Sequence, residues 1–106
     1  MRSVEFHPEA QDEFVSAAQF YEDRTKGLGL DFIRTIQRTY ERLLDFPATG
    51  ASFGRRLRRV LVPKFPYGLL YRVEPDRIYI IAVMHLHRRP GYWRSRLSDV
   101  AAEQQA

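Results

Sequence analysis

A run of apolar residues in the second half of the chain most constrains how it can fold. Ile78–Met84 contains no charged residue and is rich in β-branched side chains. It is far shorter than the roughly 20 residues of a membrane-spanning helix, and β-branched residues favour extended structure. Because polar residues do not alternate with apolar ones, the run predicts an inner strand covered on both faces. We expect helices on one face, and the C-terminal segment or a second molecule on the other.

Three other segments have strand-like composition or alternation. The expected strands are Ser3–Phe6, Leu57–Val62, Leu69–Val73 and, around the apolar run, Ile78–Leu86. Pro75 and Asp76 stand where a tight hairpin turn would join the last two strands. The last three strands are therefore predicted to form an antiparallel meander.

Between the first and second strands the apolar residues recur with a helical period. One helix is predicted from Pro8 to about Arg24 and another from about Leu30 to Phe46, where Pro47 ends it. Lys26–Gly29 is expected to be the break between them, with both glycines in the turn. A connection this short predicts an antiparallel helix hairpin whose apolar faces turn toward a sheet.

The length of the chain bounds the number of domains. With 106 residues it has room for one hydrophobic core. Residues 92–97 are expected to return as a short helix or arm, and residues 98–106 to form a polar tail. The prediction is thus one α+β domain over residues 1–97, followed by the tail.

Composition excludes several kinds of chemistry. The chain has no cysteine, so it cannot form a disulfide, a thiolate zinc site, an iron–sulfur cluster or a thiol nucleophile. No apolar stretch is typical of a signal peptide or a membrane span, so we expect a cytoplasmic protein without membrane contact. Cofactors are not expected.

Charge is distributed unevenly along the chain. Residues 1–54 contain six Lys and Arg against nine Asp and Glu, whereas residues 55–96 contain eleven against two. This asymmetry favours an acidic or nucleic-acid partner for the second half. A basic surface that only keeps a small domain soluble is the alternative.

Local clusters allow both functional and structural interpretations. His85 and His87 stand two apart on the expected strand, a spacing that metal sites use, but no third ligand is evident. Arg58 and Arg59 belong to a basic segment that could bind phosphate or discourage mispairing of an edge strand. The row formed by Arg34, Arg38 and Arg42, at four-residue spacing, is interpreted as a solvated side of the second helix.

The order of elements and several short motifs resemble the RelE/ParE superfamily of bacterial toxins from type II toxin–antitoxin systems, most closely its ParE-like branch. The residues that carry the resemblance are Phe6-His7-Pro8-Glu9-Ala10, Gly27-Leu28-Gly29, Phe46-Pro47, Phe65-Pro66-Tyr67 and residues 85–93. The likeness extends from about Ser3 to Leu97. It implies a small toxin, with a role such as plasmid stabilisation, that an antitoxin encoded beside it keeps inactive.

The resemblance leaves the target open between two classes. ParE toxins poison DNA gyrase, whereas RelE toxins cleave messenger RNA on the ribosome. Two arginines of the RNA-cleaving branch fall on Gly68 and Leu86 here, although its C-terminal tyrosine is matched by Tyr92. A gyrase inhibitor without catalytic residues is therefore favoured. If the chain is instead a ribonuclease, the expected catalytic residues are Arg72, His85 and Tyr92.

A third alternative is an inactive homologue that only binds the antitoxin. In each case the partner is expected to be an antitoxin whose acidic C-terminal half is disordered when free. Cations beside aromatic side chains are typical of binding hot spots. The residues expected to contact a partner or target are Arg58, Arg59, His87, Arg88, Arg89, Tyr92 and Trp93. Trp93 has a second interpretation, as a residue that closes the core.

Overall fold

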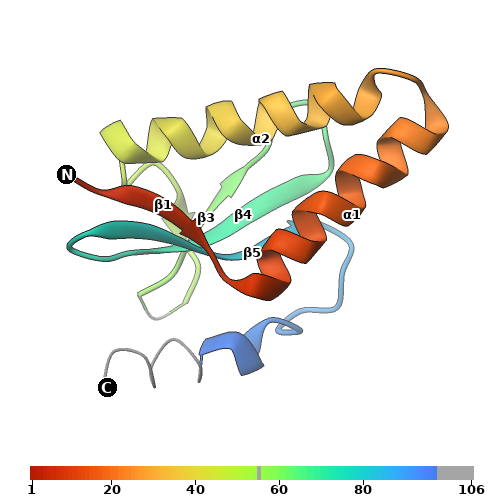
Figure 1. Ribbon diagram of the computed structural model, residues 1–106. Coiled ribbons are helices and arrows are strands. Elements are labelled where there is room, and N and C mark those ends of the chain that lie inside the picture. The colour runs from red at the N-terminus through yellow and green to blue at the C-terminus, as the bar shows by residue number, and fades with distance from the viewer. Residues whose placement is uncertain (55, 98–106) are drawn as a thin grey trace.

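The structure is a computed structural model and describes residues 1–54 and 56–97. The elements are β1 (Ser3–Phe6), α1 (Pro8–Arg24), α2 (Leu28–Asp45), β2 (Ala51–Ser52), β3 (Arg58–Leu61), β4 (Tyr67–Val73) and β5 (Arg77–His85) (Figure 1). Residues 94–97 form a helical turn. The polar tail expected at 98–106 lies outside the described residues.

The five strands form one mixed sheet in the order β1-β5-β4-β3-β2. The expected meander is present as β3, β4 and β5, and the N-terminal strand β1 lies parallel to β5, with Phe6 opposite Ile80. This arrangement confirms the α+β prediction. The expected strands did not include Ala51 and Ser52, which pair with Arg59 and Arg58 as the short edge strand β2.

The helix hairpin is also confirmed, but its second helix begins earlier than expected. Gly27, at φ 89°, is the N-cap of α2, so Gly29 lies inside the helix and is not a turn residue. A Cβ at Gly29 would lie 2.6 Å from the backbone oxygen of Ala18 and 2.8 Å from Cβ of Glu22. Gly29 is therefore required by the close approach of the two helices. Helix period alone does not reveal such an approach.

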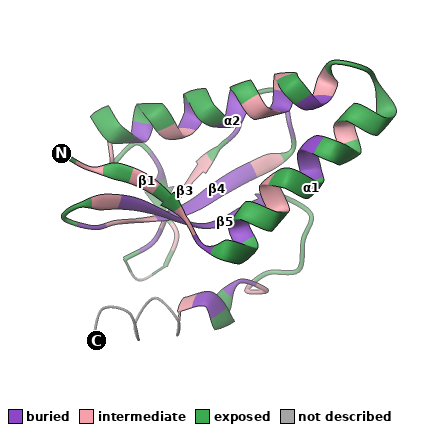
Figure 2. Ribbon diagram, viewed as in Figure 1, coloured by how far each residue is buried: buried purple, intermediate pink, exposed green. Residues whose placement is uncertain are grey.

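The sheet divides the core into two clusters. The larger cluster lies between the sheet and both helices and includes Phe32, Ile36, Leu43, Leu69 and Tyr71. Figure 2 shows the buried residues on the strands and on the inward sides of the helices. Both faces of β5 are covered, so Ile78–Met84 are all buried and exposed residues do not alternate with buried ones. The sequence predicted this strand as an inner one.

The opposite face of the sheet is covered by the chain's own C-terminal segment. Trp93, Tyr92 and Leu97 pack with Leu70, Tyr79 and other residues of the second cluster. In Figure 1 this segment lies across the sheet from the helices. Of the two covers considered for this face, the C-terminal segment is therefore the one observed. The apolar strand does not require a second molecule.

Candidate partner-binding site

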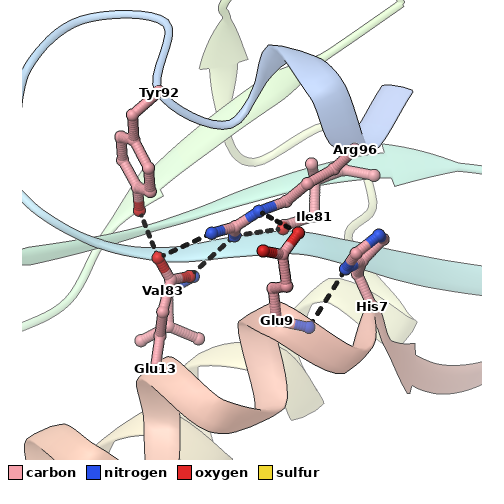
Figure 3. A network of polar contacts seen from close by, with 7 residues as sticks. All are labelled: His7, Glu9, Glu13, Ile81, Val83, Tyr92 and Arg96. Atoms are coloured by element: carbon pink, nitrogen blue, oxygen red, sulfur yellow. Dashed lines mark hydrogen bonds and ion pairs between the residues drawn. The ribbon is translucent and has the colours of Figure 1, made fainter. Parts of the chain in front are cut away.

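A single carboxylate joins helix α1, strand β5 and the C-terminal segment (Figure 3). Oε1 of Glu13 accepts hydrogen bonds from the Val83 amide at 3.0 Å and from Nη1 of Arg96 at 2.8 Å. Oε2 accepts from the Tyr92 hydroxyl at 2.7 Å and from Nη2 of Arg96 at 3.0 Å. The pairing with Arg96 is therefore bidentate, the strongest geometry for this ion pair.

This network satisfies backbone groups that have no strand partner on the β1 side. Phe6 and Ile80 are the last pair between β1 and β5, so the chain beyond Ile80 has no strand on that side. Nη1 of Arg96 donates to the Ile81 carbonyl at 3.0 Å, while Glu13 accepts from the Val83 amide. The two side chains thus take over hydrogen bonds that a longer β1 would have made.

Burial makes the network energetically important. Arg96 is 6% exposed, and its Nε lies 3.5 Å from a carboxylate oxygen of the exposed Glu9. Burial, reinforced by the hydrogen bond to Glu13, raises the pKa of Tyr92 well above its ordinary value. Tyr92 is consequently held as a neutral hydrogen-bond donor. The network fixes the C-terminal segment, and with it the loop that precedes it.

That loop closes one side of a basic depression of about 480 Å³, which we call the arginine hollow. It is lined by Arg59, Arg88, Arg89 and Arg94, with Phe53, Met84, Leu86 and Trp93 among its apolar residues. The described residues that line it include no carboxylate. Within residues 1–54 and 56–97, none of the four guanidinium groups forms an ion pair with a carboxylate.

Two of these arginines rest on aromatic rings. The guanidinium carbon of Arg59 lies 4.7 Å from the centre of the Phe53 ring, and that of Arg88 lies 4.0 Å from the centre of the Tyr92 ring. Gly68 provides room for Arg59, because a Cβ at Gly68 would lie 3.3 Å from the Arg59 side chain. Stacking of this kind restricts the guanidinium planes while their N–H groups can still reach a ligand.

The structure brings part of the predicted contact set together. Arg59, Arg88, Arg89 and Trp93 line the arginine hollow, although Trp93 is only 8% exposed and belongs to the core beneath it. Arg58 lies on the helix side of the sheet and donates to the Gly50 carbonyl at 2.8 Å. Burial therefore favours the core interpretation of Trp93 over a contact role.

The histidines are arranged differently from the expected strand pair. β5 ends at His85, and the His87 amide in the following turn donates to Nδ1 of His85 at 3.1 Å. The two rings are 5.2 Å apart between centres. In the described part of the chain, no group of three His, Asp or Glu residues could hold a metal ion.

The three residues expected of a ribonuclease do not converge. Arg72 pairs with Tyr79, which packs in the second cluster, whereas His85 pairs with Tyr67 on the helix side at the other end of β5. Six residues along a strand separate these positions by about 20 Å. Tyr92, the third residue, is engaged by Glu13. No shared site for a scissile phosphate results from this placement.

Sequence reasoning missed Glu13 and Arg96, the central pair of the network. The pair is separated by 83 positions, and no periodic or local signal connects them. Arg94 and Phe53 were missed in the hollow for the same reason. The asymmetry of charge was the signal that pointed to this half of the molecule.

Comparison with known proteins agrees with the fold and the motifs. A family model described as the ParE toxin of type II toxin–antitoxin systems, parDE, matches residues 4–90. A solved structure titled as the chromosomal ParDE toxin–antitoxin system from P. aeruginosa aligns with a TM-score of 0.67 at 19% identity, covering 80% of this chain and 96% of that chain. No curated protein sequence matches the chain. The described helices include none long and apolar enough to cross a membrane.

Proposed function

The chain belongs to the ParE toxin family of type II toxin–antitoxin systems, and from this we propose that it inhibits DNA gyrase by protein–protein binding and that a cognate antitoxin neutralises it. Such inhibition requires a complementary surface and no catalytic group. The observation that carries this choice is the separation of Arg72 from His85, which argues against RNA cleavage. A basic contact surface near the C-terminal segment is compatible with the proposal.

The helix hairpin offers the antitoxin a separate surface. A groove of about 450 Å³ runs between α1 and α2, where the exposed side chains of Val15 and Leu30 lie beside Phe14 and Ile33. An amphipathic helix could place its apolar side in such a groove. We propose that the acidic C-terminal half of the antitoxin folds as it binds here.

The target is tested with purified toxin in two assays run in parallel. We expect inhibition of gyrase supercoiling, or trapping of cleaved DNA, and intact messenger RNA on translating ribosomes. Codon-phased cuts that disappear in the Tyr92→Phe or His85→Ala variant would establish the ribonuclease alternative instead. Folded protein that accumulates at high level without growth arrest would identify an inactive homologue.

The antitoxin site is tested by placing a charge in the groove. Leu30→Glu should weaken binding of the co-expressed antitoxin, because it buries a carboxylate against the antitoxin's apolar side. Leu44→Glu is the matched control, since Leu44 is also exposed on α2 but does not line the groove. Equal antitoxin binding by both variants would move the antitoxin site away from the groove.

A further inference from the structure

The arginine hollow has a concentration of positive charge that no carboxylate among its described lining residues neutralises. Four arginines line it, and the lining residues within 1–54 and 56–97 include no Asp or Glu. Two buried or half-buried arginines elsewhere are paired with carboxylates: Arg77 with Glu74, and Arg96 with Glu13. Like charges that lie close together repel each other. Binding of an anion in the hollow is therefore electrostatically favourable.

Two of the arginine side chains in the hollow are already held in place in the free protein. Arg59 and Arg88 are supported by the rings of Phe53 and Tyr92, and Tyr92 is itself fixed by Glu13. Guanidinium groups present planar N–H forks that match phosphate oxygens. Because part of the ordering is already present in the free protein, less conformational entropy is lost on binding.

The lining favours a phosphodiester backbone over an acidic amphipathic peptide. Met84 and Trp93, which form part of the apolar floor, are each 8% exposed and therefore gain little from further burial. Val15 and Leu30, at 59% and 49%, are more exposed than Leu86 of the hollow, at 38%, and they lie on the helix hairpin, where an amphipathic partner would bury them. What the hollow chiefly offers is a set of cations, which suits a chain of regularly spaced phosphates.

We propose that the arginine hollow binds the sugar–phosphate backbone of duplex DNA. The inference rests on the proposed function for the kind of nucleic acid, and it adds a contact that inhibition by protein–protein binding does not require. It chooses DNA over RNA on the ground that gyrase, the proposed target, acts on duplex DNA. A toxin that touches DNA phosphates would be retained where gyrase works.

Binding is measured without gyrase, by fluorescence anisotropy of a short labelled duplex at low and moderate salt. If the four arginines each neutralise one phosphate, affinity should fall about 150-fold between about 50 and 200 mM salt. Arg88→Ala with Arg89→Ala should reduce that loss to about 12-fold, because the salt slope decreases by about one for each phosphate contact removed. Arg59→Ala with Arg94→Ala should have the same effect.

Arg34→Ala with Arg38→Ala is the matched control, because it removes the same charge from the exposed side of α2. It should keep the wild-type salt slope. If the control lowers the slope as much as the hollow variants do, binding is a property of net charge and the proposal fails. Tighter binding of a labelled RNA strand, or of polyglutamate, would also overturn it.

Wild-type protein alone supplies a second measurement. Trp93 is the only tryptophan of the chain and, although 8% exposed, it lines the hollow. Phosphate charges bound beside the indole should therefore shift its fluorescence as duplex DNA saturates the site. Unchanged fluorescence at saturation would place the DNA elsewhere. Because neither measurement includes gyrase, their failure leaves the supercoiling assay to decide the proposed function independently.

Discussion

The two faces of the central sheet are covered by different means. On the helix face, two long helices bury a continuous apolar cluster that contains Phe32, Ile36 and Leu43, each 0% exposed. The opposite face carries a smaller cluster, and its cover is also held by the carboxylate of Glu13 and the guanidinium of Arg96. The helix face thus depends on the apolar packing of many side chains, and the other face on a smaller apolar cluster together with a few polar atoms.

This difference determines how each face should respond to a single change. Apolar packing shows little dependence on pH and shares its free energy among many contacts. A buried ion pair fails when either partner is lost, because the remaining charge stays without compensation. We therefore expect the loss of stability on the helix face to increase with the side-chain volume that a substitution removes. On the opposite face, we expect it to depend on the charge and the hydrogen bonds that are lost.

The largest effect is expected on the helix face. Phe32→Ala should lower the free energy of unfolding by about 3–5 kcal/mol, because it leaves a cavity in the larger cluster. Urea denaturation measures the change. Leu30→Ala, two positions away and 49% exposed, is the control and should change stability by about 0.5 kcal/mol or less. Similar losses in both variants would show that the helix face is not packed as described.

The second effect concerns the ion pair of the opposite face. Glu13→Gln should lower the free energy of unfolding by about 3 kcal/mol, because an amide cannot accept both donors of Arg96 while compensating its charge. Glu9→Gln is the control, since Glu9 is exposed and lies 3.5 Å from Arg96, and should cost no more than about 1 kcal/mol. Equal costs would mean that burial of Glu13 contributes nothing.

Alkaline pH should expose the role of Tyr92. Its pKa is raised in the folded chain, so its stabilising contribution is complete below pH 10 and is lost as the pH rises above that value. There the unfolded chain releases the proton first, and stability should fall by up to about 1.4 kcal/mol per pH unit. The wild-type advantage over Tyr92→Phe, about 1.5 kcal/mol at neutral pH, should therefore shrink between pH 10 and 12. The free energy of unfolding of both proteins is measured by urea denaturation at each pH. A difference between them that stays constant from pH 10 to 12 would contradict this.

The smallest effect on stability is expected at the surface of the hollow. Arg88→Ala with Arg89→Ala should cost less than about 1 kcal/mol, because both side chains are exposed and Arg88 loses only its contact with the Tyr92 ring. The melting temperature should move by a few degrees at most, while growth inhibition decreases. A large loss of stability with full remaining toxicity would assign these residues to the fold.

The fold was largely predictable because its signals are local. The helix period of residues 8–46 and the unbroken apolar run in β5 depend on neighbouring side chains, and both predicted elements are present. The short strand β2 was missed, because pairing of two residues with β3 leaves no pattern in Ala51 and Ser52. Gly29 was misplaced because its requirement comes from Ala18 and Glu22 on the other helix.

The site was less predictable because its residues come from segments that are far apart in the sequence and meet only in the folded chain. Arg59, Arg88 and Arg89 could be selected by charge, but their convergence with Arg94 depends on how the C-terminal segment crosses the sheet. The separation of Arg72 from His85 depends on the register of β4 and β5. Register fixes which face and which end each side chain occupies.

By itself, the sequence determined the kinds of elements, their order, the apolar faces that had to be buried and the half of the chain that carries the positive charge. These are properties of neighbouring residues, and they act through period, propensity and net charge. Only the tertiary structure decided that the C-terminal segment covers β5, that Glu13 holds it there through Arg96 and Tyr92, and that four arginines share one depression. Those contacts join residues far apart in the chain, and their geometry is set by the packing of the whole sheet.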